Sequence, residues 1–293
     1  RWWPLSREFG CSSRPAVTPA HFAGRPWTRQ PTDGAPVSTE PATTPGSPPE
    51  DLSPFRDRGP VDDDLAVEIL LEADLEILGR MPWSSNSTFL VDARRGDQLL
   101  QGVYKPGRGE RSLHDFPPCL YRREAAAYEL ARYLGWNLVP PTVVRDGPLG
   151  EGSVQLLIPC DYDEHYFTLH DDPRRANELV RLAAFDMVAN NTDRKSGHVL
   201  AGHDGQLWAV DNALCFHHQF KVRTVIWDFA GWPVPERLLD DLRRLVDKGV
   251  PEPLARLLNT LETDAVLARA RALLEEAHLP ADPSGRRIPW PLL

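Results

Sequence analysis

The sequence is poor in sulfur and lacks any long apolar run. Only four of its 293 residues are cysteine and two are methionine. The scattered cysteines never form a Cys-x-x-Cys pair, which argues against a zinc ribbon or a disulfide framework, so we expect buried free thiols. No window approaches the roughly 18 consecutive apolar residues that a membrane-spanning helix needs, and the first residues lack the apolar core of a secretory signal. We therefore expect a cytoplasmic protein that does not insert into membranes.

An excess of basic residues is also lacking. The chain has 33 Lys and Arg against 42 Asp and Glu, a formal net charge of -9. Nucleic-acid binders draw most of their affinity from clustered Lys and Arg, so we expect no nucleic-acid partner. The composition, 41% hydrophobic and 26% charged, is that of a globular protein long enough for one large domain or two packed lobes. It leaves the oligomeric state open.

Aliphatic side chains are scarce in residues 1–60, which hold twelve of the 29 prolines. Such a segment cannot bury enough apolar surface to offset the entropy lost on ordering, so we expect a disordered, Pro-rich extension. No methionine precedes Met81. Residue 1 is therefore not an ordinary initiator: the chain is a fragment, a processed product, or a translation begun too far upstream. In the last case the extension is not part of the native protein.

Regular patterns begin after residue 60. Acidic residues at 62–64 indicate the start of a short helix that continues through Leu71. The stretch "DLEILGRMPWSSNSTFLVDARRGDQLLQGVYKP", residues 74–106, reads as three short strands separated by turn residues. Its alternating segments "STFLVDA" and "LLQGVYKP" are typical of antiparallel pairing.

The next segment predicts a helix and two further strands. "LYRREAAAYELARYLG", residues 120–135, places apolar side chains one helical turn apart and ends at Gly135, as an amphipathic helix does. "VPPTVVRDGPLGEGSVQLLIP" then reads as two strands around a Gly-rich turn, the second ending at Pro159.

After Pro159 the pattern becomes mainly helical. Apolar spacing over 176–187 predicts a long helix, followed by two strands around the loop 202–205 and further helices near 235–248 and 263–277. We therefore expect an α+β, bilobal arrangement: a small antiparallel-sheet N-lobe over 61–159 and a mainly helical C-lobe over 160–293, with a cleft between the lobes.

Two acidic residues flank the predicted hairpin of the second lobe. Asp193 follows the long helix in a polar turn, and Asp211 follows the apolar strand "LWAV". A hairpin of this length brings its two ends together, so both carboxylates can face one ligand. Phosphoryl transfer needs one carboxylate for the acceptor hydroxyl and another for the magnesium on the phosphates. The structural alternative is a turn cap at Asp193 and a salt bridge at Asp211.

A lysine and a glutamate of the first lobe suit the same chemistry. Lys105 ends a predicted strand and Glu124 lies near the start of the following helix. A lysine fixed on a sheet can hold nucleotide phosphates, and a helix glutamate can hold the ammonium in place. Taken singly, each is better explained as an exposed surface residue: a lysine at a strand end, or a glutamate in the first turn of a helix.

Together these motifs resemble the phosphatidylinositol 3-/4-kinase-like superfamily, which includes HipA-type serine kinases. "TDRKSGHVL" resembles its catalytic loop and "VDNALCF" its metal-binding segment. "GVYKPGRGERSL", "RREAAAYELARYLG" and "VPPTVV" are similar in order and spacing to an uncharacterised actinobacterial branch. The resemblance implies a protein-kinase-like fold and a nucleotide site between the lobes.

The resemblance also implies roles for individual residues. Asp193 would be the catalytic aspartate, and Asp211 the main magnesium ligand. The ATP phosphates would meet Lys105, held by Glu124, and the turn formed by Ser84, Ser85, Asn86 and Ser87. The backbone of the hinge, Leu157 and Ile158, would meet the adenine.

The chain departs from the superfamily pattern in its catalytic loop. His198 stands where a metal-binding asparagine is expected, and Lys195 replaces a histidine. Two hypotheses follow besides an ATP- and Mg2+-dependent kinase acting on a protein hydroxyl or a small metabolite. One is a pseudokinase-type nucleotide-binding regulator, and the other is an adenylyl transferase on the same fold. A lipid acceptor is not expected, because no Lys/Arg cluster would hold this acidic protein to a membrane.

Overall fold

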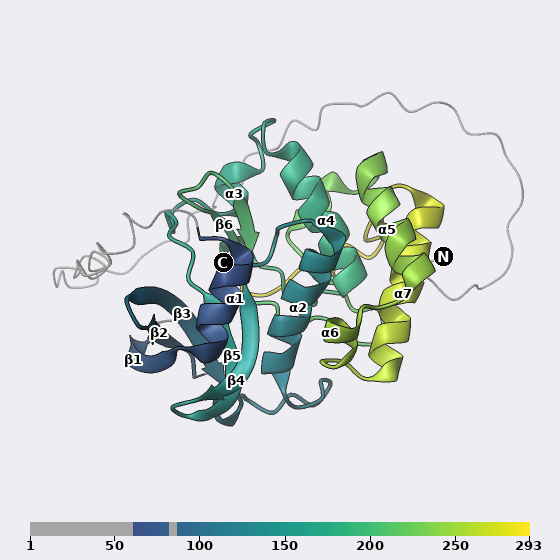
Figure 1. The fold of residues 1–293 in the computed structure, drawn as a ribbon. Helices are drawn as coiled ribbons and strands as arrows, with labels where there is room; N and C mark the ends of the chain where they lie inside the picture. The colour runs from purple at the N-terminus through teal and green to yellow at the C-terminus, as the bar shows by residue number, and fades with distance from the viewer. Residues whose placement is uncertain (1–60, 82–86) are drawn as a thin grey trace, which may run out of the picture. The chain divides into compact units, whose positions relative to one another are not determined.

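A five-stranded antiparallel sheet forms the first part of the fold (Figure 1). The computed structural model of the chain describes residues 61–81 and 87–293. The strands lie in the order β1-β2-β3-β5-β4. Their bounds are β1 (Asp74–Arg80), β2 (Phe89–Arg95), β3 (Gln98–Pro106), β4 (Thr142–Gly147) and β5 (Gly150–Leu156). The five strands expected from the alternating segments are confirmed.

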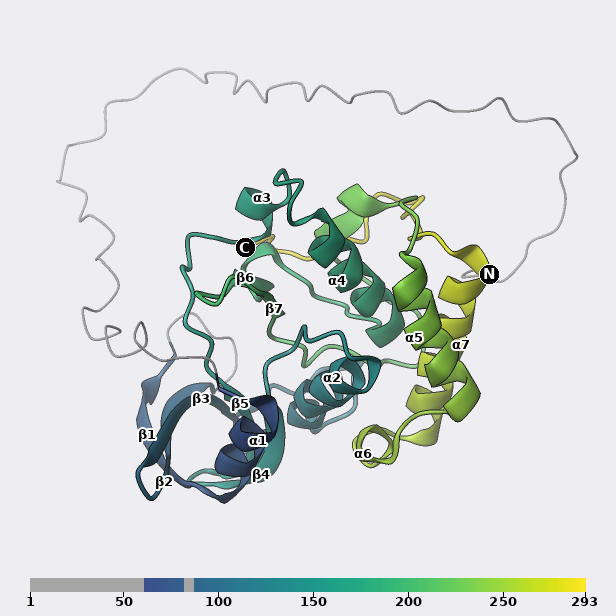
Figure 2. The same ribbon diagram turned by 45° about the horizontal axis from the view of Figure 1, so that its top comes forward.

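Helix α1 (Asp63–Glu72) covers one face of this sheet (Figure 2). It begins where the Asp62 side chain accepts hydrogen bonds from the next backbone N–H groups. Its buried Ile69 and Leu70 form a core with inward-facing strand residues such as Tyr104. Because successive strand residues point to opposite faces, Lys105 emerges on the other side of β3. The sheet thereby directs Lys105 away from the α1 core.

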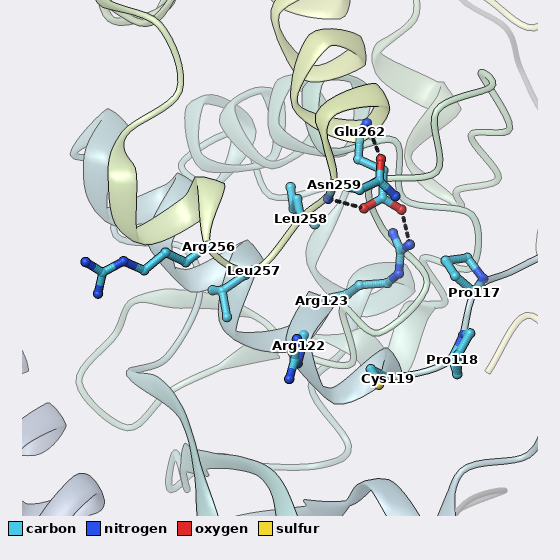
Figure 3. Close-up of a pocket in the computed structure, with 10 residues that line it drawn as sticks. All are labelled: Pro117, Pro118, Cys119, Arg122, Arg123, Arg256, Leu257, Leu258, Asn259 and Glu262. Carbon is cyan, nitrogen blue, oxygen red and sulfur yellow. Dashed lines mark hydrogen bonds and ion pairs between the residues drawn. The ribbon is translucent and has the colours of Figure 1, made fainter.

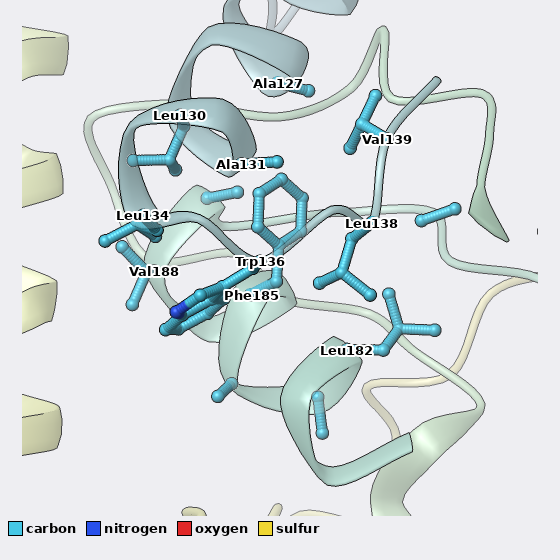
Figure 4. Close-up of a cluster of buried hydrophobic side chains, with 14 of the residues drawn as sticks. Ala127, Leu130, Ala131, Leu134, Trp136, Leu138, Val139, Leu182, Phe185 and Val188 are labelled. Carbon is cyan, nitrogen blue, oxygen red and sulfur yellow. The ribbon is translucent and has the colours of Figure 1, made fainter. Parts of the chain in front are cut away.

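Helix α2 (Leu120–Leu134) lies between the sheet and the remaining helices (Figure 2). It ends at Gly135, whose φ of 70° is readily adopted by glycine. Its buried face packs with the loop after it and with α4, where Trp136 and Phe185 meet (Figure 4). The elements that follow are α3 (Tyr166–Leu169), α4 (Ala176–Ala189), β6 (Val199–Ala201), β7 (Leu207–Ala209), α5 (Glu236–Lys248), α6 (Glu252–Ala255) and α7 (Thr260–Glu276).

A buried ion pair ties the start of α2 to the start of α7 (Figure 3). The Arg123 guanidinium pairs with Glu262 and also donates to the Cys215 carbonyl at 2.6 Å. Glu262 in turn accepts a hydrogen bond from the Asn259 backbone N–H at 3.0 Å. Helix α2 is therefore fixed to the helical part by polar contacts as well as by its apolar face.

The expected fold class is confirmed: an antiparallel sheet with helices in the C-terminal part. The predicted end of the second strand at Pro159 is wrong, because β5 ends at Leu156 and the next residues lead into the second part. The described cysteines are free thiols, but only Cys215 is buried. No helix among the described residues is both long and apolar enough to cross a membrane. The division into domains at residues 60 and 159 stays a prediction.

Candidate active site

The side chain of Lys105 meets two carboxylates from different parts of the fold. Its ammonium pairs with Glu124 of α2 and with Asp211 Oδ1, which lies 2.9 Å away. Burial works against the charged ammonium, but Asp211 and Glu124 outweigh it and raise the pKa of Lys105 above its ordinary value. Lys105 is therefore held as a cation in the gap between the sheet and the loop after β7.

Glu124 is almost fully buried, at 2% exposure, and is bonded on both sides. One carboxylate oxygen pairs with Lys105, and the other accepts a hydrogen bond from the Asn212 backbone N–H at 2.8 Å. Burial raises the pKa of Glu124, while Lys105 opposes that rise. A single carboxylate thus joins β3, α2 and the segment that carries Asp211.

Asp211 lies in a left-handed backbone conformation, with a φ of 54°. It lies two residues after the end of β7 at Ala209. Its half-exposed carboxylate reaches both Lys105 and His198, whose Nε2 is 3.4 Å from Asp211 Oδ2. Lys105 lowers the pKa of Asp211 against the effect of burial, and His198 adds to the lowering. Burial lowers the pKa of His198 to about 4, so at neutral pH the imidazole is uncharged, and its Nδ1 accepts a hydrogen bond from the Lys195 backbone N–H at 3.4 Å.

Asp193 lies on the turn between α4 and the short strand β6. Its backbone N–H donates to Asn191 Oδ1 at 2.9 Å, and the Lys195 ammonium lies 3.8 Å from its carboxylate. Burial raises the pKa of Asp193 to about 6; Lys195 partly offsets this rise and the nearby charge of Asp211 adds to it. Asp193 is therefore a partly exposed carboxylate that can take up a proton near neutral pH.

The hairpin β6–β7 brings the two aspartate segments together, as the spacing predicts. The Val210 N–H donates to the His198 carbonyl at 3.0 Å, and the Thr192 N–H donates to the Leu214 carbonyl at 3.0 Å. These bonds link the two flanks of the hairpin on both sides of Asp211. The structure thus assembles Lys105, Glu124, His198 and Asp211 through direct contacts, with Asp193 on the adjoining turn.

Sequence reasoning missed Arg194, which is completely buried at 0% exposure. Its guanidinium forms an ion pair with Asp186 of α4 at 2.9 Å and donates to Asn212 Oδ1 at 2.7 Å. It also donates to the Val210 carbonyl at 2.8 Å. The one available signal was Asp186 itself, a single acid inside the apolar run "LAAFDMVA". Arg194 therefore positions both aspartate segments against α4.

The structure describes only some of the residues that are expected to surround the nucleotide. Ser84, Ser85 and Asn86 lie outside the described residues. Ser87 precedes β2, and its N–H donates to the Gly109 carbonyl at 3.3 Å, joining the turn before β2 to the loop after β3. In the expected hinge, the Leu157 N–H donates to the Gln101 carbonyl at 2.9 Å, so that donor is already used within the protein.

A small apolar cluster, also missed from sequence, joins the hinge to the β6–β7 hairpin. Ile158 packs there with Leu200 and Trp208, and Val210 borders the group. The cluster lies next in sequence to both His198 and Asp211. Its three members are buried, so the cluster is a small core that joins the hinge to the hairpin beside the charged site.

The charged residues fit a divalent metal ion only in part. No group of three or more His, Cys, Asp and Glu side chains that could hold a metal occurs in residues 61–81 and 87–293. Asp211 and His198 offer one carboxylate and one neutral imidazole. Mg2+ usually takes one or two carboxylates and completes its shell with phosphates and water. The donor set therefore fits a metal whose remaining ligands come from a bound nucleotide.

A solved kinase structure has the same fold. The crystal structure of the Golgi casein kinase with Mn/ADP bound is similar at a TM-score of 0.52 and 16% identity, covering 73% of this chain and 75% of that chain. The structure of hydra Fam20 with sugar is similar at a TM-score of 0.48 and 16% identity, covering 74% and 89%. The chain has a kinase-like fold.

Sequence comparison gives a closer relationship. No protein-family model matches the chain. Protein Rv2133c of Mycobacterium tuberculosis is 39% identical over 270 residues, covering 78% of this chain and 95% of the relative. The chain therefore belongs to the same family as Mycobacterium tuberculosis protein Rv2133c.

Proposed function

We propose that the chain is a kinase-type phosphotransferase that uses ATP and a divalent metal ion, Mg2+ in the first instance. The observation that carries the proposal is the meeting of Lys105, Glu124 and Asp211, which three separate segments bring together. A lysine held by a helix glutamate beside a metal-binding aspartate is the arrangement that phosphoryl transfer uses.

In this proposal each charged residue has one task. Lys105 binds the phosphates, and Glu124 keeps its ammonium in place. Asp193 accepts the proton of the acceptor hydroxyl, for which its raised pKa of about 6 is suited. Asp211 and His198 would hold the metal ion, which when bound neutralises negative charge on the phosphates. We place the adenine beside the apolar cluster at Ile158.

The order of the motifs supports a finer assignment. Lys105, Glu124, Asp193 and Asp211 follow one another as in the phosphatidylinositol 3-/4-kinase-like superfamily, and their side chains gather at one site. We therefore place the chain among the HipA-related members of that superfamily.

The test compares metal-dependent ATP binding and ADP formation in the wild-type protein and in the variant Asp211→Asn. ATP at about 100 times its Kd should stabilise the wild-type protein by roughly 2.7 kcal/mol in a thermal-shift titration with Mg2+. Asp211→Asn should weaken that binding at least about tenfold and remove ADP formation. Asp247→Asn, an exposed change on α5, is the matched control and should behave as wild type. Sustained ADP formation by Asp211→Asn would refute the assignment.

The departures at His198 and Lys195 favour one alternative, a nucleotide-binding pseudokinase. Lys195 lies 3.8 Å from the carboxylate of Asp193, where it competes with an incoming acceptor. The same titration separates the two functions. Stabilisation by ATP that does not depend on metal, together with no ADP formation, would favour the pseudokinase.

A further inference from the structure

A pocket of about 210 Å³ opens directly beside Asp193. Thr192, Asp193 and Leu214 line it from the catalytic turn and the segment after Asp211, and Phe116 lines it from the loop before α2. Leu113 and Asp115 line it from the same loop as Phe116, and Lys221 and Arg223 add two cations. Any group in this pocket would touch the carboxylate to which the proposed function assigns the acceptor proton.

The backbone of Arg223 is fixed against the catalytic turn. Its N–H donates to the Asn191 carbonyl at 3.0 Å, and its carbonyl accepts from the Arg194 N–H at 3.0 Å. These two bonds flank Asp193 in sequence, so the Arg223 side chain starts beside the catalytic carboxylate. The charge of Arg223 accordingly contributes to the electrostatic environment of Asp193.

The two cations of the pocket differ in whether a carboxylate of the protein pairs with them. The Lys221 ammonium pairs with Asp115 at 3.1 Å and lies 5.7 Å from the centre of the Phe116 ring. Arg223 is exposed, and its guanidinium makes no hydrogen bond or ion pair with any described residue. Arg223 is therefore the cation of the pocket that no described side chain pairs with, and its charge acts on the neighbouring Asp193.

The larger pocket in Figure 3 shows the contrast. It is lined by three arginines, but each of them has a carboxylate partner within the protein: Arg122 with Glu151, Arg123 with Glu262 and Arg256 with Glu252. No reacting carboxylate like Asp193 lines that pocket. Of the two pockets, only the one beside Asp193 combines an available cation with a candidate base.

We infer that the acceptor is a small hydroxyl compound that also carries a carboxylate or phosphate group, bound by Arg223 in the pocket beside Asp193. The inference rests on the proposed function. A guanidinium presents a planar pair of donors that matches either anion, and such charge-assisted pairs are about twice as strong as neutral hydrogen bonds. The volume is below the roughly 300–1,000 Å³ of most ligand pockets, which favours a small acceptor.

The proposed reaction moves the γ-phosphoryl group of ATP to the hydroxyl oxygen of the acceptor. The acceptor oxygen forms a bond to the γ-phosphorus of ATP while the bond from that phosphorus to the β,γ-bridging oxygen breaks. The hydroxyl proton passes to the Asp193 carboxylate, and ADP leaves with the electron pair of the broken bond. Arg223 takes no part in these bonds; it orients the acceptor through the remote anion.

Three acceptors of similar size test the charge requirement: glycerate, glycerol 3-phosphate and neutral glycerol. Each is incubated with ATP, Mg2+ and the purified full chain, and phosphorylated products are measured by mass spectrometry. We expect transfer to one or both charged acceptors with a higher kcat/KM than to glycerol. Whichever of the two is preferred identifies the anion as carboxylate or phosphate. Equal transfer to all three, or preference for glycerol, would overturn the inference.

Arg223→Gln tests the residue itself. Losing a hydrogen bond between charged groups costs about 1.5–3 kcal/mol, so the preference for the charged acceptor over glycerol should fall roughly 10- to 100-fold, mainly through KM. Arg223→Lys should restore part of it. Arg271→Gln, an exposed change on α7, is the matched control and should keep the preference. An unchanged preference in Arg223→Gln would also overturn the inference.

Failure of the inference and failure of the proposed function give different results. A wild-type protein that neither binds ATP with metal nor forms ADP refutes the proposed function, and the inference with it. A protein that binds ATP with metal and phosphorylates only larger or neutral acceptors, such as an uncharged serine peptide, keeps the proposed function and refutes the inference alone.

Discussion

At the scale of single residues, Glu124 shows how burial and charge combine in this site. Its carboxylate is 2% exposed and would be costly to bury alone, but a lysine and a backbone N–H satisfy its two oxygens. Buried ion pairs contribute little net stability compared with apolar packing. The value of this one lies in the geometry that it imposes on Lys105 and Asn212.

Asp193 makes the proposed reaction pH-dependent. Burial raises its pKa to about 6. The base must be ionised, so kcat should fall about tenfold per pH unit below 6 and should not fall for this reason above 7. Lys195 opposes the rise, and Lys195→Met should therefore move the midpoint of the pH–rate profile to higher pH. A wild-type midpoint near 4 would contradict the role of Asp193 as the base.

His198 should set the metal preference of the site. An imidazole suits later transition metals better than Mg2+, whereas an amide oxygen suits Mg2+. We expect His198→Asn to shift the ratio of Mg2+ to Co2+ affinity about tenfold toward Mg2+. Titration calorimetry with a non-hydrolysable ATP analogue measures both affinities. His203→Asn, exposed in the loop after β6, is the control, and an unchanged ratio in His198→Asn would show that His198 is not a ligand.

The sequence allowed part of this site to be predicted. Lys105, Glu124 and Asp211 were identified because charged residues at the ends of predicted elements form a known functional order. Arg194 was not, since an arginine in a polar turn looks exposed until the hydrogen bonds to Asp186 and Asn212 are known. The Leu157 N–H likewise looked available, and only the sheet pairing shows that Gln101 occupies it.

At the scale of elements, helix α7 begins with a reciprocal cap. Asn259 Oδ1 accepts from the Glu262 N–H at 3.1 Å, and Glu262 accepts in return from the Asn259 N–H. The other side of Glu262 pairs with Arg123 of α2. The cap therefore orients the carboxylate that joins the two helices.

We expect Asn259→Ala to destabilise the protein by about 1 kcal/mol, the usual cost of losing such a cap. For a chain of this size the melting temperature should fall by roughly 2–4 °C. Asn259→Ser keeps an oxygen acceptor and is the matched control. Melting curves followed by circular dichroism measure both, and equal melting temperatures for the two variants would contradict a role for the cap.

Element prediction succeeded where the pattern was long. Helices α2 and α4 follow from apolar spacing over three or more turns, and the first three strands follow from alternation. The short helices α3 and α6 were not predicted, since four residues are too few to show a period. The early end of β5 reflects tertiary pairing, which the sequence pattern does not contain.

At the scale of the molecule, residues near position 292 support the turn that carries Asp193. The Ser196 N–H, three residues after Asp193, donates to the Leu292 carbonyl at 2.8 Å. The Leu292 side chain packs against the main apolar core, and the Arg287 carbonyl accepts from Trp227 Nε1 at 2.6 Å. The turn is thus held from outside as well as by Arg194 from within.

Ending the chain after Arg287 should therefore lower both the melting temperature and kcat. The truncation removes the acceptor for the Ser196 N–H and the packing of Leu292. Trp290→Ala is the control, because that side chain is 84% exposed. Calorimetry and steady-state kinetics measure the two effects. A truncated protein with wild-type kcat would show that residues near position 292 do not support the turn.

Two neighbouring residues of α2, Arg123 and Glu124, determine how freely this helix can move relative to the site. Arg123 binds the helix to α7 and to the Cys215 carbonyl, while Glu124 binds it to Lys105 and Asn212. Swinging α2 outward to switch the site off would break both sets of contacts at once. The site is therefore built to stay assembled.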